Sequence, residues 1–378
     1  MMSKLELLSS GPIYLNPDPG YTHVTALFSH IVPLDGDELL CTYNRGQGMY
    51  ATDLSFWQAR SHDGGRTWGD HTLITDRSLD DRPYSYHSPF ISHMRDGLLV
   101  FVAFRVDRSD PNRPIFNEKT GGLTELELIL QRSADKGVTW SPPETIGVPA
   151  DMVITPSSAI VELPDGRWFL AHDQWHAFDD PGPYKPRTVG FFSDDKGKTW
   201  NAPVSFANGS AEGKGFWHGR ITPLTDQRLF ALFWSAEMSD PMGDLPLHRC
   251  FGTADSREWS TPEATNILGQ TNAVVDLGDG RFVAIYTSRE QTSPGFFACV
   301  SDDWGLTWDI ANQIVVWDAT GRERLGIDAP ESYPRSHDTI AYGAPTANLL
   351  NNGDILFSFW CTEMSITHIR YALLKTRS

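Results

Sequence analysis

The sequence predicts an all-β fold, a six-bladed β-propeller in which each blade is a sheet of four antiparallel strands. Two patterns that recur along nearly the whole chain carry this prediction: a Ser-x-Asp-x-Gly-x-Thr-Trp motif, and a short turn between two apolar segments. A repeat of roughly 60 residues with β-like periodicity is typical of propeller blades and excludes helical solenoids. The composition agrees, because 25 Pro and 32 Gly suit many short strands joined by tight turns. We therefore expect residues 1–378 to form one propeller domain.

The Ser-x-Asp-x-Gly-x-Thr-Trp motif, known as an Asp box, is intact four times and decayed once. The intact copies begin at Ser61, Ser133, Ser193 and Ser301, and the decayed copy runs from Thr253 through Asp255 to Trp259. In such a turn the Asp and Ser side chains accept backbone N–H groups, the Gly adopts a left-handed conformation, and the Trp packs between sheets. The four aspartates Asp63, Asp135, Asp195 and Asp303 are therefore predicted to stabilise turns and to take no part in chemistry.

The second pattern predicts six hairpins. Its turns are Asp35-Gly36, Asp96-Gly97, Asp165-Gly166, Asp226-Gln227, Asp279-Gly280 and Asn352-Gly353. A run of β-forming residues follows each turn, as expected for the second strand of a hairpin. Each repeat then consists of a strand, a hairpin turn, a strand, a loop, a strand, an Asp box and a last strand.

The two ends of the chain are predicted to complete one blade together. The last repeat, about residues 339 to 378, has room for three strands and lacks an Asp box. The extended stretches Leu5–Leu8 and Ile13–Leu15 precede the first hairpin and belong to no other repeat. We expect this N-terminal segment to supply the outer strand of the sixth blade, which would leave the ring without an open edge.

Charge and composition bound the possible partners. The net charge of −17 is spread along the chain, which disfavours nucleic acid and anionic membranes as partners. No apolar run reaches the roughly 20 residues of a membrane span, and residues 1–8 do not resemble a signal peptide, so we expect a cytoplasmic protein. The four cysteines, Cys41, Cys250, Cys299 and Cys361, have no metal-binding spacing and are expected to be buried free thiols. No metal or other cofactor is predicted.

The Asp boxes and hairpins together resemble the sialidase superfamily of bacterial and animal glycosidases. The resemblance implies a site on the face opposite the Asp boxes, built by the loops that enter the first strand and the loops that join the second and third strands of each blade. Sialidases hold the substrate carboxylate with three arginines and use a Tyr nucleophile backed by a Glu and an Asp acid/base. The strand that should carry the first arginine, His23–His30, contains none. The resemblance therefore implies weak or absent cleavage of simple sialosides.

The remaining positions match the family pattern unevenly. Asp53, which follows Asn44-Arg45-Gly46, matches the acid/base position best. Arg289 and Tyr342 approximate the blade-five arginine and the nucleophile, and His218 and Trp234 fall near the family's Glu and second arginine. The resemblance thus implies Asp53 as the general acid and either Tyr342 or Glu237 as nucleophile or base.

Loops of the predicted mouth also contain many side chains suited to binding sugars. Aromatic rings stack on sugar rings, and Arg binds carboxylates or sulfates through two parallel hydrogen bonds. The candidate substrate-binding residues are Arg45, Arg82, His87, Trp175, His218, Arg220, Arg289 and His337. The long insertion Asp107–Thr124 is predicted to form a lid or wall over the channel, the alternative being a surface decoration or an oligomer contact.

These residues point to a carbohydrate-active enzyme, a sialidase-fold glycoside hydrolase acting on an acidic or otherwise polar glycan terminus. One alternative is a polysaccharide lyase, in which Tyr or His removes the proton next to a uronate carboxylate that Arg neutralises. Another is a propeller that binds a glycan or a protein without catalysis. The density of His, Asp and Glu beside Arg favours an enzyme.

Overall fold

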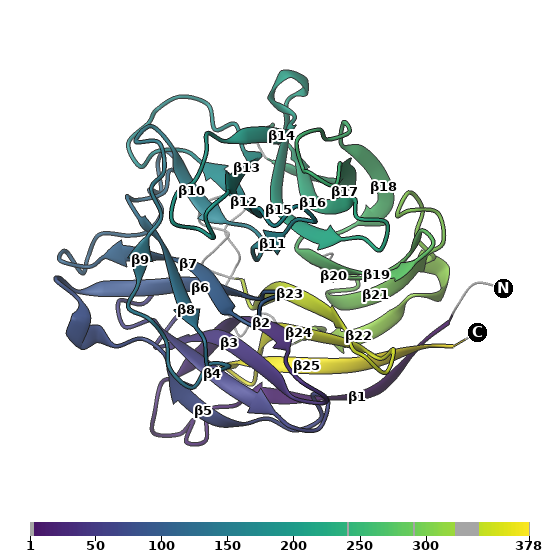
Figure 1. Ribbon diagram of the computed structural model, residues 1–378, viewed down its shortest axis with the longest axis horizontal. Coiled ribbons are helices and arrows are strands. Elements are labelled where there is room, and N and C mark those ends of the chain that lie inside the picture. The colour runs from purple at the N-terminus through teal and green to yellow at the C-terminus, as the bar shows by residue number, and fades with distance from the viewer. Residues whose placement is uncertain (1–3, 240–241, 290–291, 322–339, 378) are drawn as a thin grey trace.

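The computed structural model describes residues 4–239, 242–289, 292–321 and 340–377, which form six antiparallel sheets around a central channel (Figure 1). From the channel outwards, the first sheet consists of β2 (Thr25–Pro33), β3 (Leu39–Gly46), β4 (Ser55–Ser61) and β5 (Gly69–Leu73). In the same direction, the second sheet consists of β6 (Tyr84–His93), β7 (Leu99–Asp107), β8 (Glu127–Ser133) and β9 (Glu144–Thr145). The third sheet consists of β10 (Val153–Pro156) with β11 (Val161–Glu162), then β12 (Trp168–Trp175), β13 (Arg187–Ser193) and β14 (Val204–Asn208).

The other three sheets follow the same order. They are β15 (Lys214–Pro223), β16 (Leu229–Glu237), β17 (Gly243–Gly252) and β18 (Glu263–Leu268); β19 (Asn272–Gly278), β20 (Arg281–Ser288), β21 (Gly295–Ser301) and β22 (Ile314–Asp318); and β23 (Tyr342–Leu349), β24 (Ile355–Glu363), β25 (Ile366–Arg377) and β1 (Lys4–Tyr14). Within the described ranges, three short 3₁₀ helices lie in loops, at Arg77–Leu79, Ser210–Glu212 and Ile310–Asn312. The predicted six-bladed propeller is confirmed.

The sixth blade joins the two ends of the chain, as the sequence predicts. Strand β1 pairs with β25 in antiparallel register from Lys4 opposite Arg377 to Tyr14 opposite Ile369. The Ser10 hydroxyl adds a hydrogen bond of 2.9 Å to the Tyr371 carbonyl. Figure 1 shows the two termini side by side at the outer edge of this blade. Since β1 covers the outer edge of β25, the first and last parts of the chain are held in one sheet.

Apolar side chains of neighbouring blades pack together and fix the spacing of the ring. Between the first two blades, for example, Leu40 and Phe56 pack with Ile91 and Phe101, and all four are fully buried. Full burial of such a side chain contributes about 1.5–3 kcal/mol. All four cysteines are buried and free, as expected. No helix among the described residues is long and apolar enough to cross a membrane.

The four Ser-x-Asp-x-Gly-x-Thr-Trp turns share one hydrogen-bond pattern. In the last copy, Asp303 accepts the Ser301 hydroxyl at 2.9 Å, the Thr307 N–H at 2.8 Å and the Thr307 hydroxyl at 2.6 Å. Gly305, with φ of 75°, donates its N–H to the Ser301 hydroxyl at 2.9 Å. Burial raises the pKa of Asp303, but these hydrogen bonds outweigh burial and leave that pKa below its usual value.

These turns lie on the same face of the propeller as the hairpin turns. The Trp304 N–H donates to the Gly280 carbonyl at 2.8 Å, and Lys196 forms an ion pair of 2.8 Å with Asp96 in the hairpin turn of the preceding blade. Loops that join second and third strands therefore open on the opposite face, which we call the mouth.

Replacing Asp303 by Ala should lower the free energy of unfolding by about 1–3 kcal/mol, because the Thr307 N–H and two hydroxyl groups lose their acceptor. Denaturant unfolding measures this. The matched control is Asp302→Ala, since Asp302 is exposed in the same turn. A ligand-binding or catalytic defect in correctly folded Asp303→Ala protein would contradict the purely structural role.

Candidate functional site

The inner strands of four blades are distorted at the same level of the channel. Phe28, Ser88, His218 and Ala344 have φ values of 53°, 55°, 52° and 48°. Each lies where the pairing register of its strand shifts, which defines a β-bulge. A left-handed conformation costs a residue with a side chain roughly 1–2 kcal/mol. Such strain is concentrated at functional sites, and all four residues line one pocket.

A polar side chain from the preceding blade holds three of these bulges. The bulge N–H groups and their acceptors are Ser88 and Asn44 Oδ1 (2.8 Å), His218 and both Asp173 carboxyl oxygens (3.0 Å each), and Ala344 and Thr271 Oγ1 (3.2 Å). Each hydrogen bond crosses from one blade to the next. The distorted backbone is therefore fixed by the packing of the ring.

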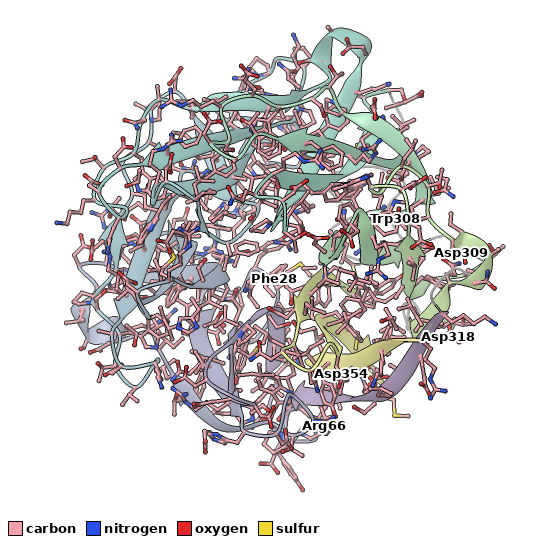
Figure 2. The ribbon with its side chains drawn as sticks, turned by 45° about the vertical axis from the view of Figure 1, so that its right-hand side comes forward. Phe28, Arg66, Trp308, Asp309, Asp318 and Asp354 are labelled. Atoms are coloured by element: carbon pink, nitrogen blue, oxygen red, sulfur yellow. The ribbon has the colours of Figure 1, made fainter. Side chains whose placement is uncertain are left out.

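The pocket at this level, called the mouth pocket, is a cavity of about 140 Å³ with contributions from all six blades. Its walls are largely aromatic: Phe28, Tyr50, Phe90, Phe104, Phe116, Trp175, Trp234 and Trp360. Figure 2 shows Phe28 beside the central opening, whereas Arg66, from one of the repeated turns, lies at the rim. Aromatic faces of this kind suit the apolar face of a sugar ring.

Arg220 projects into the channel at the inner end of the mouth pocket. Its Nη1 donates to the Ser157 carbonyl at 2.9 Å, and its guanidinium lies 4.7 Å from the centre of the Phe90 ring. Its buried Nε has no hydrogen-bond partner in the described part of the chain. Burial lowers the pKa of Arg220 to about 10, partly offset by Asp173. The side chain is thus a desolvated cation.

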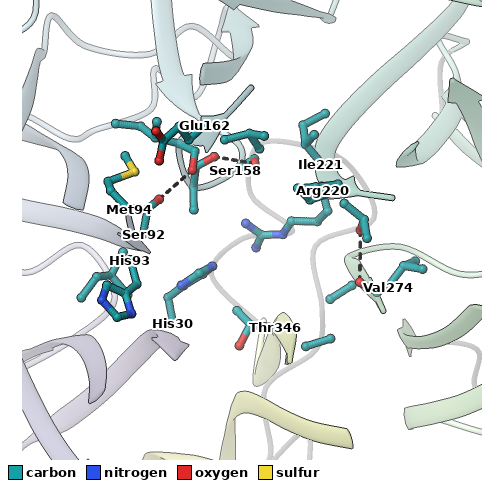
Figure 3. Close-up of a pocket in the computed structure, with 18 of the residues that line it drawn as sticks. His30, Ser92, His93, Met94, Ser158, Glu162, Arg220, Ile221, Val274 and Thr346 are labelled. Atoms are coloured by element: carbon teal, nitrogen blue, oxygen red, sulfur yellow. Dashed lines mark hydrogen bonds between the residues drawn. The ribbon is translucent and has the colours of Figure 1, made fainter. Parts of the chain in front are cut away.

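Arg220 also separates the mouth pocket from a second cavity of about 350 Å³, which opens on the opposite face. Figure 3 shows the Arg220 guanidinium and the His30 ring turned toward each other across this cavity. Burial, together with the charge of Arg220, lowers the pKa of His30 to about 3. His30 is therefore neutral near pH 7, and Arg220 is the cation on the channel axis.

Arg289 supplies a second cation from the fifth blade. Its guanidinium donates to the Gln270 side chain and the Tyr342 carbonyl, while its buried Nε has no hydrogen-bond partner among the residues that the structure describes. Burial lowers the pKa of Arg289. Neither Arg220 nor Arg289 is paired with a carboxylate among the described residues. Two guanidinium groups that form no ion pair with a carboxylate of the described residues make the mouth pocket attractive to an anion.

Two histidines line the mouth pocket in different states. His87 is buried, stacks on Phe104 with ring centres 4.9 Å apart, and shares a hydrogen bond of 2.8 Å with Ser85. Burial, together with Arg108, lowers its pKa to about 3, so His87 is neutral. His218 lies more open, with its ring parallel to Trp234 and its Nδ1 3.5 Å from an Asp173 oxygen. His218 is therefore the better placed of the two to exchange a proton with a ligand.

The residues expected as catalytic lie elsewhere. Asp53 and Arg45 line a separate cleft on the first blade, called the Arg45 cleft, with Thr22, His23 and Trp57 among its other residues. The Asp53 carboxylate accepts the Gln47 N–H at 3.0 Å, so it caps the turn of its own loop. The Arg45 guanidinium lies 4.3 Å from the Trp57 ring centre. The structure thus keeps this pair together but places it outside the mouth pocket.

Tyr342 and Glu237 are also absent from the residues that line the mouth pocket. The Tyr342 hydroxyl is buried and donates to the Ser288 carbonyl at 2.7 Å, so it points into the core instead of toward a ligand. Glu237 is exposed at the end of β16. Neither position fits the role of nucleophile or base for a ligand held in the mouth pocket.

The candidate binding residues divide in a similar way. His87, Trp175, His218, Arg220 and Arg289 all line the mouth pocket. Arg82 lies outside it and pairs with Asp81 at 3.2 Å and Asp107 at 3.1 Å on the surface. His337 lies outside the described residues.

The sequence patterns do not predict the four bulges. Two of them have a local signal in the sequence, a proline that follows the bulge residue, Pro89 after Ser88 and Pro345 after Ala344. Proline inside a strand is essentially confined to edges and bulges, because it cannot donate a backbone hydrogen bond. Phe28 and His218 are followed by Ser and Gly and give no such signal.

The insertion Asp107–Thr124 forms one wall of the mouth pocket. Three of its residues, Ile115, Phe116 and Leu123, line the cavity. The Leu123 N–H donates to the His176 carbonyl at 2.9 Å, and Asn117 donates to the Phe178 carbonyl at 2.8 Å. Of the predicted alternatives, the structure shows the wall, docked on the third blade by hydrogen bonds.

One group of side chains has the composition of a metal site. Cys361, Glu363 and His368 have ligand atoms within 4.8 Å of one another. However, Arg370 donates to the Glu363 carboxylate at 2.9 Å, and a guanidinium at that distance repels a bound cation. We therefore assign no metal to this group.

Comparisons with known proteins agree with the fold. The family described as a BNR repeat-like domain matches residues 37–338. One similar solved structure is a protein of unknown function from Dyadobacter fermentans, with a TM-score of 0.73 and 18% sequence identity over 99% of this chain and 100% of that chain. Another is a Hadza microbial sialidase, with a TM-score of 0.68 and 14% sequence identity over 98% of this chain and 68% of that chain. An α-L-arabinanase from Penicillium chrysogenum complexed with arabinobiose is also similar, with a TM-score of 0.62 and 13% sequence identity over 99% of this chain and 98% of that chain. A search of curated proteins finds no match.

The strain at the bulges can be measured at Ala344. Replacing Ala344 by Gly should raise the free energy of unfolding by about 0.5–1 kcal/mol, because the relief of the left-handed conformation exceeds the entropy that Gly loses on folding. The matched control is Ala347→Gly in the regular part of the same strand, which should lower that free energy by a similar amount. If both variants are equally destabilised in denaturant unfolding, the bulge carries no strain.

Proposed function

The chain belongs to the family of BNR repeat-like domains, and we propose that it is a carbohydrate-active enzyme that binds the acidic end of a glycan in the mouth pocket and hydrolyses the adjacent glycosidic bond. The observation that carries this proposal is the presence of two buried guanidinium groups, Arg220 and Arg289, without a carboxylate partner among the described residues. A carboxylate or sulfate would satisfy their unpaired donors. The aromatic walls supply stacking surfaces for the sugar ring.

The roles within the pocket follow from position. Arg220 and Arg289 would bind the anionic group, and Trp234 and Trp175 would contact the ring. Protonated His218 would give its proton to the leaving glycosidic oxygen as the glycosidic bond breaks, and it would take a proton back from the water molecule that attacks the anomeric carbon. A positioned proton donor typically contributes about 10²–10⁴-fold to the rate. His218 takes this role in place of Asp53, Tyr342 and Glu237, which do not line the pocket.

The comparisons support this class of substrate only through the shared scaffold. A sialidase and an arabinanase are among the similar solved structures, and both names denote enzymes acting on glycans. An acidic sugar is proposed from the two arginines. The strand that should provide a third arginine, β2, contains none, so a sialic acid would be held less well than in a sialidase.

One observation favours a lyase as a second candidate. None of the described residues that line the mouth pocket is an Asp or a Glu, whereas glycoside hydrolases generally use a pair of carboxyl groups. In a lyase the two arginines would neutralise a uronate carboxylate, and His218 would remove the neighbouring proton. The bond from the next ring carbon to the glycosidic oxygen would break, and that oxygen would leave with a proton from His218 or water. The products then contain a new double bond and absorb in the near ultraviolet, which hydrolysis products do not.

The test is turnover of paired acidic and neutral glycans, with reducing ends and near-ultraviolet absorbance measured together. Arg289→Met should lower kcat/KM on an acidic glycan by about 10²-fold, because the anion loses one charged partner, and should change a neutral one little. Arg289→Lys keeps the positive charge but lacks the planar guanidinium group. Its kcat/KM on the acidic glycan should therefore lie between the values of the native protein and Arg289→Met. Thermal unfolding shows whether each variant is folded.

The matched control is Arg45→Met, which removes an arginine from the Arg45 cleft and should leave turnover unchanged. Equal losses on acidic and neutral glycans in folded Arg289→Met protein would sink the anion-binding role. Binding without any turnover by the native protein would indicate a propeller that binds glycans without catalysis.

A further inference from the structure

Asp173 contacts His218 at two places from behind the mouth pocket. Both of its carboxyl oxygens accept the His218 N–H at 3.0 Å, and one lies 3.5 Å from the imidazole Nδ1. Asp173 is 1% exposed, so a ligand in the mouth pocket contacts His218 and not Asp173. Any effect of this carboxyl group on a ligand must therefore pass through the histidine.

The first blade shows that a bulge does not need a carboxyl group. Asn44 lies on the second strand of its blade, as Asp173 does, and accepts the N–H of the bulge residue Ser88 at 2.8 Å. A neutral amide therefore performs the same backbone task. Burying a carboxyl group costs more than burying an amide, because its charged form loses hydration. The bulge alone therefore does not account for a carboxyl group at position 173.

His218 is the polar group best placed to use this carboxyl. Arg220, also on β15, lowers the pKa of Asp173 through its charge but forms no ion pair with it. His172, the preceding residue of β12, is neutral because burial lowers its pKa to about 3. If Nδ1 carries a hydrogen directed at Asp173, the other ring nitrogen, Nε2, is the one left to exchange a proton with a ligand.

We propose that Asp173 is the positioning residue of the site: its carboxylate holds His218 with a hydrogen on Nδ1 and with Nε2 directed to the mouth pocket. The inference rests on the proposed function in one respect, because that function requires His218 to transfer a proton to or from the ligand. Burial raises the pKa of Asp173 to about 7, opposed by the His218 N–H and by Arg220.

The decisive variant is Asp173→Asn, because Asn44 shows that an amide can hold such a bulge. We expect this variant to fold with a melting temperature near that of the native protein. The imidazole pKa of His218, followed by NMR with labelled histidine and assigned with His218→Gln, should fall, since an anionic neighbour is lost. On a glycan that the protein cleaves, kcat should fall about 10²–10⁴-fold with little change in KM.

Two controls separate positioning from folding. Asp173→Ala removes the acceptor of the His218 N–H and should lower the melting temperature as well. Asn44→Asp places a carboxyl at the matching position of the first blade and should leave the His218 titration unchanged.

The NMR titration needs no substrate, so it tests Asp173 even if no glycan is cleaved. An unchanged His218 pKa and tautomer in folded Asp173→Asn protein would overturn the proposal. Unchanged kcat in that variant would overturn it as well. A shifted titration without any cleavage by the native protein would sustain the pairing and count against the proposed function alone.

Discussion

The pairing of β1 with β25 is the interaction on which the rest of the structure depends. It brings residues 4–14 to the outer edge of the last blade and joins the two ends of the chain in one sheet. Without this pairing the sixth blade would have three strands, with β25 as its outer edge. Every blade also packs on two neighbours, and the first and last blades meet through β2, β23 and β24, so the position of each inner strand is fixed from both sides.

That constraint explains how the channel can hold a distorted backbone. Phe28, Ser88, His218 and Ala344 are all left-handed, and this conformation survives because side chains of adjacent blades hold the N–H groups of three of them. The distortion turns His218 toward the mouth pocket and sets Arg220 two residues further into the channel. The stability of the ring is thus used to keep a small number of polar groups at fixed positions in an aromatic pocket.

The sequence predicts the fold better than the site because fold signals here are local. A hairpin turn such as Asp96-Gly97, or a motif such as Ser301–Trp308, determines its own geometry through contacts within a few residues. The side-chain direction of Tyr342 depends on the Ser288 carbonyl, which comes from another blade, and no spacing in the sequence reveals it. Asp53 stays in its loop because it caps Gln47. The resemblance to sialidases, by contrast, predicts Arg289 and His218 at the mouth, and both line the mouth pocket.

The central claim is that Arg220 and Arg289 of the mouth pocket, which form no ion pair with any described carboxylate, bind the anionic group of a sugar. A crystal structure of the protein soaked with glucuronate tests it most directly. The account predicts that the carboxylate lies within hydrogen-bonding distance of the Arg220 and Arg289 guanidinium groups, with the sugar ring against the aromatic wall. Glucuronate bound in the Arg45 cleft, with the mouth pocket empty of sugar, would contradict it.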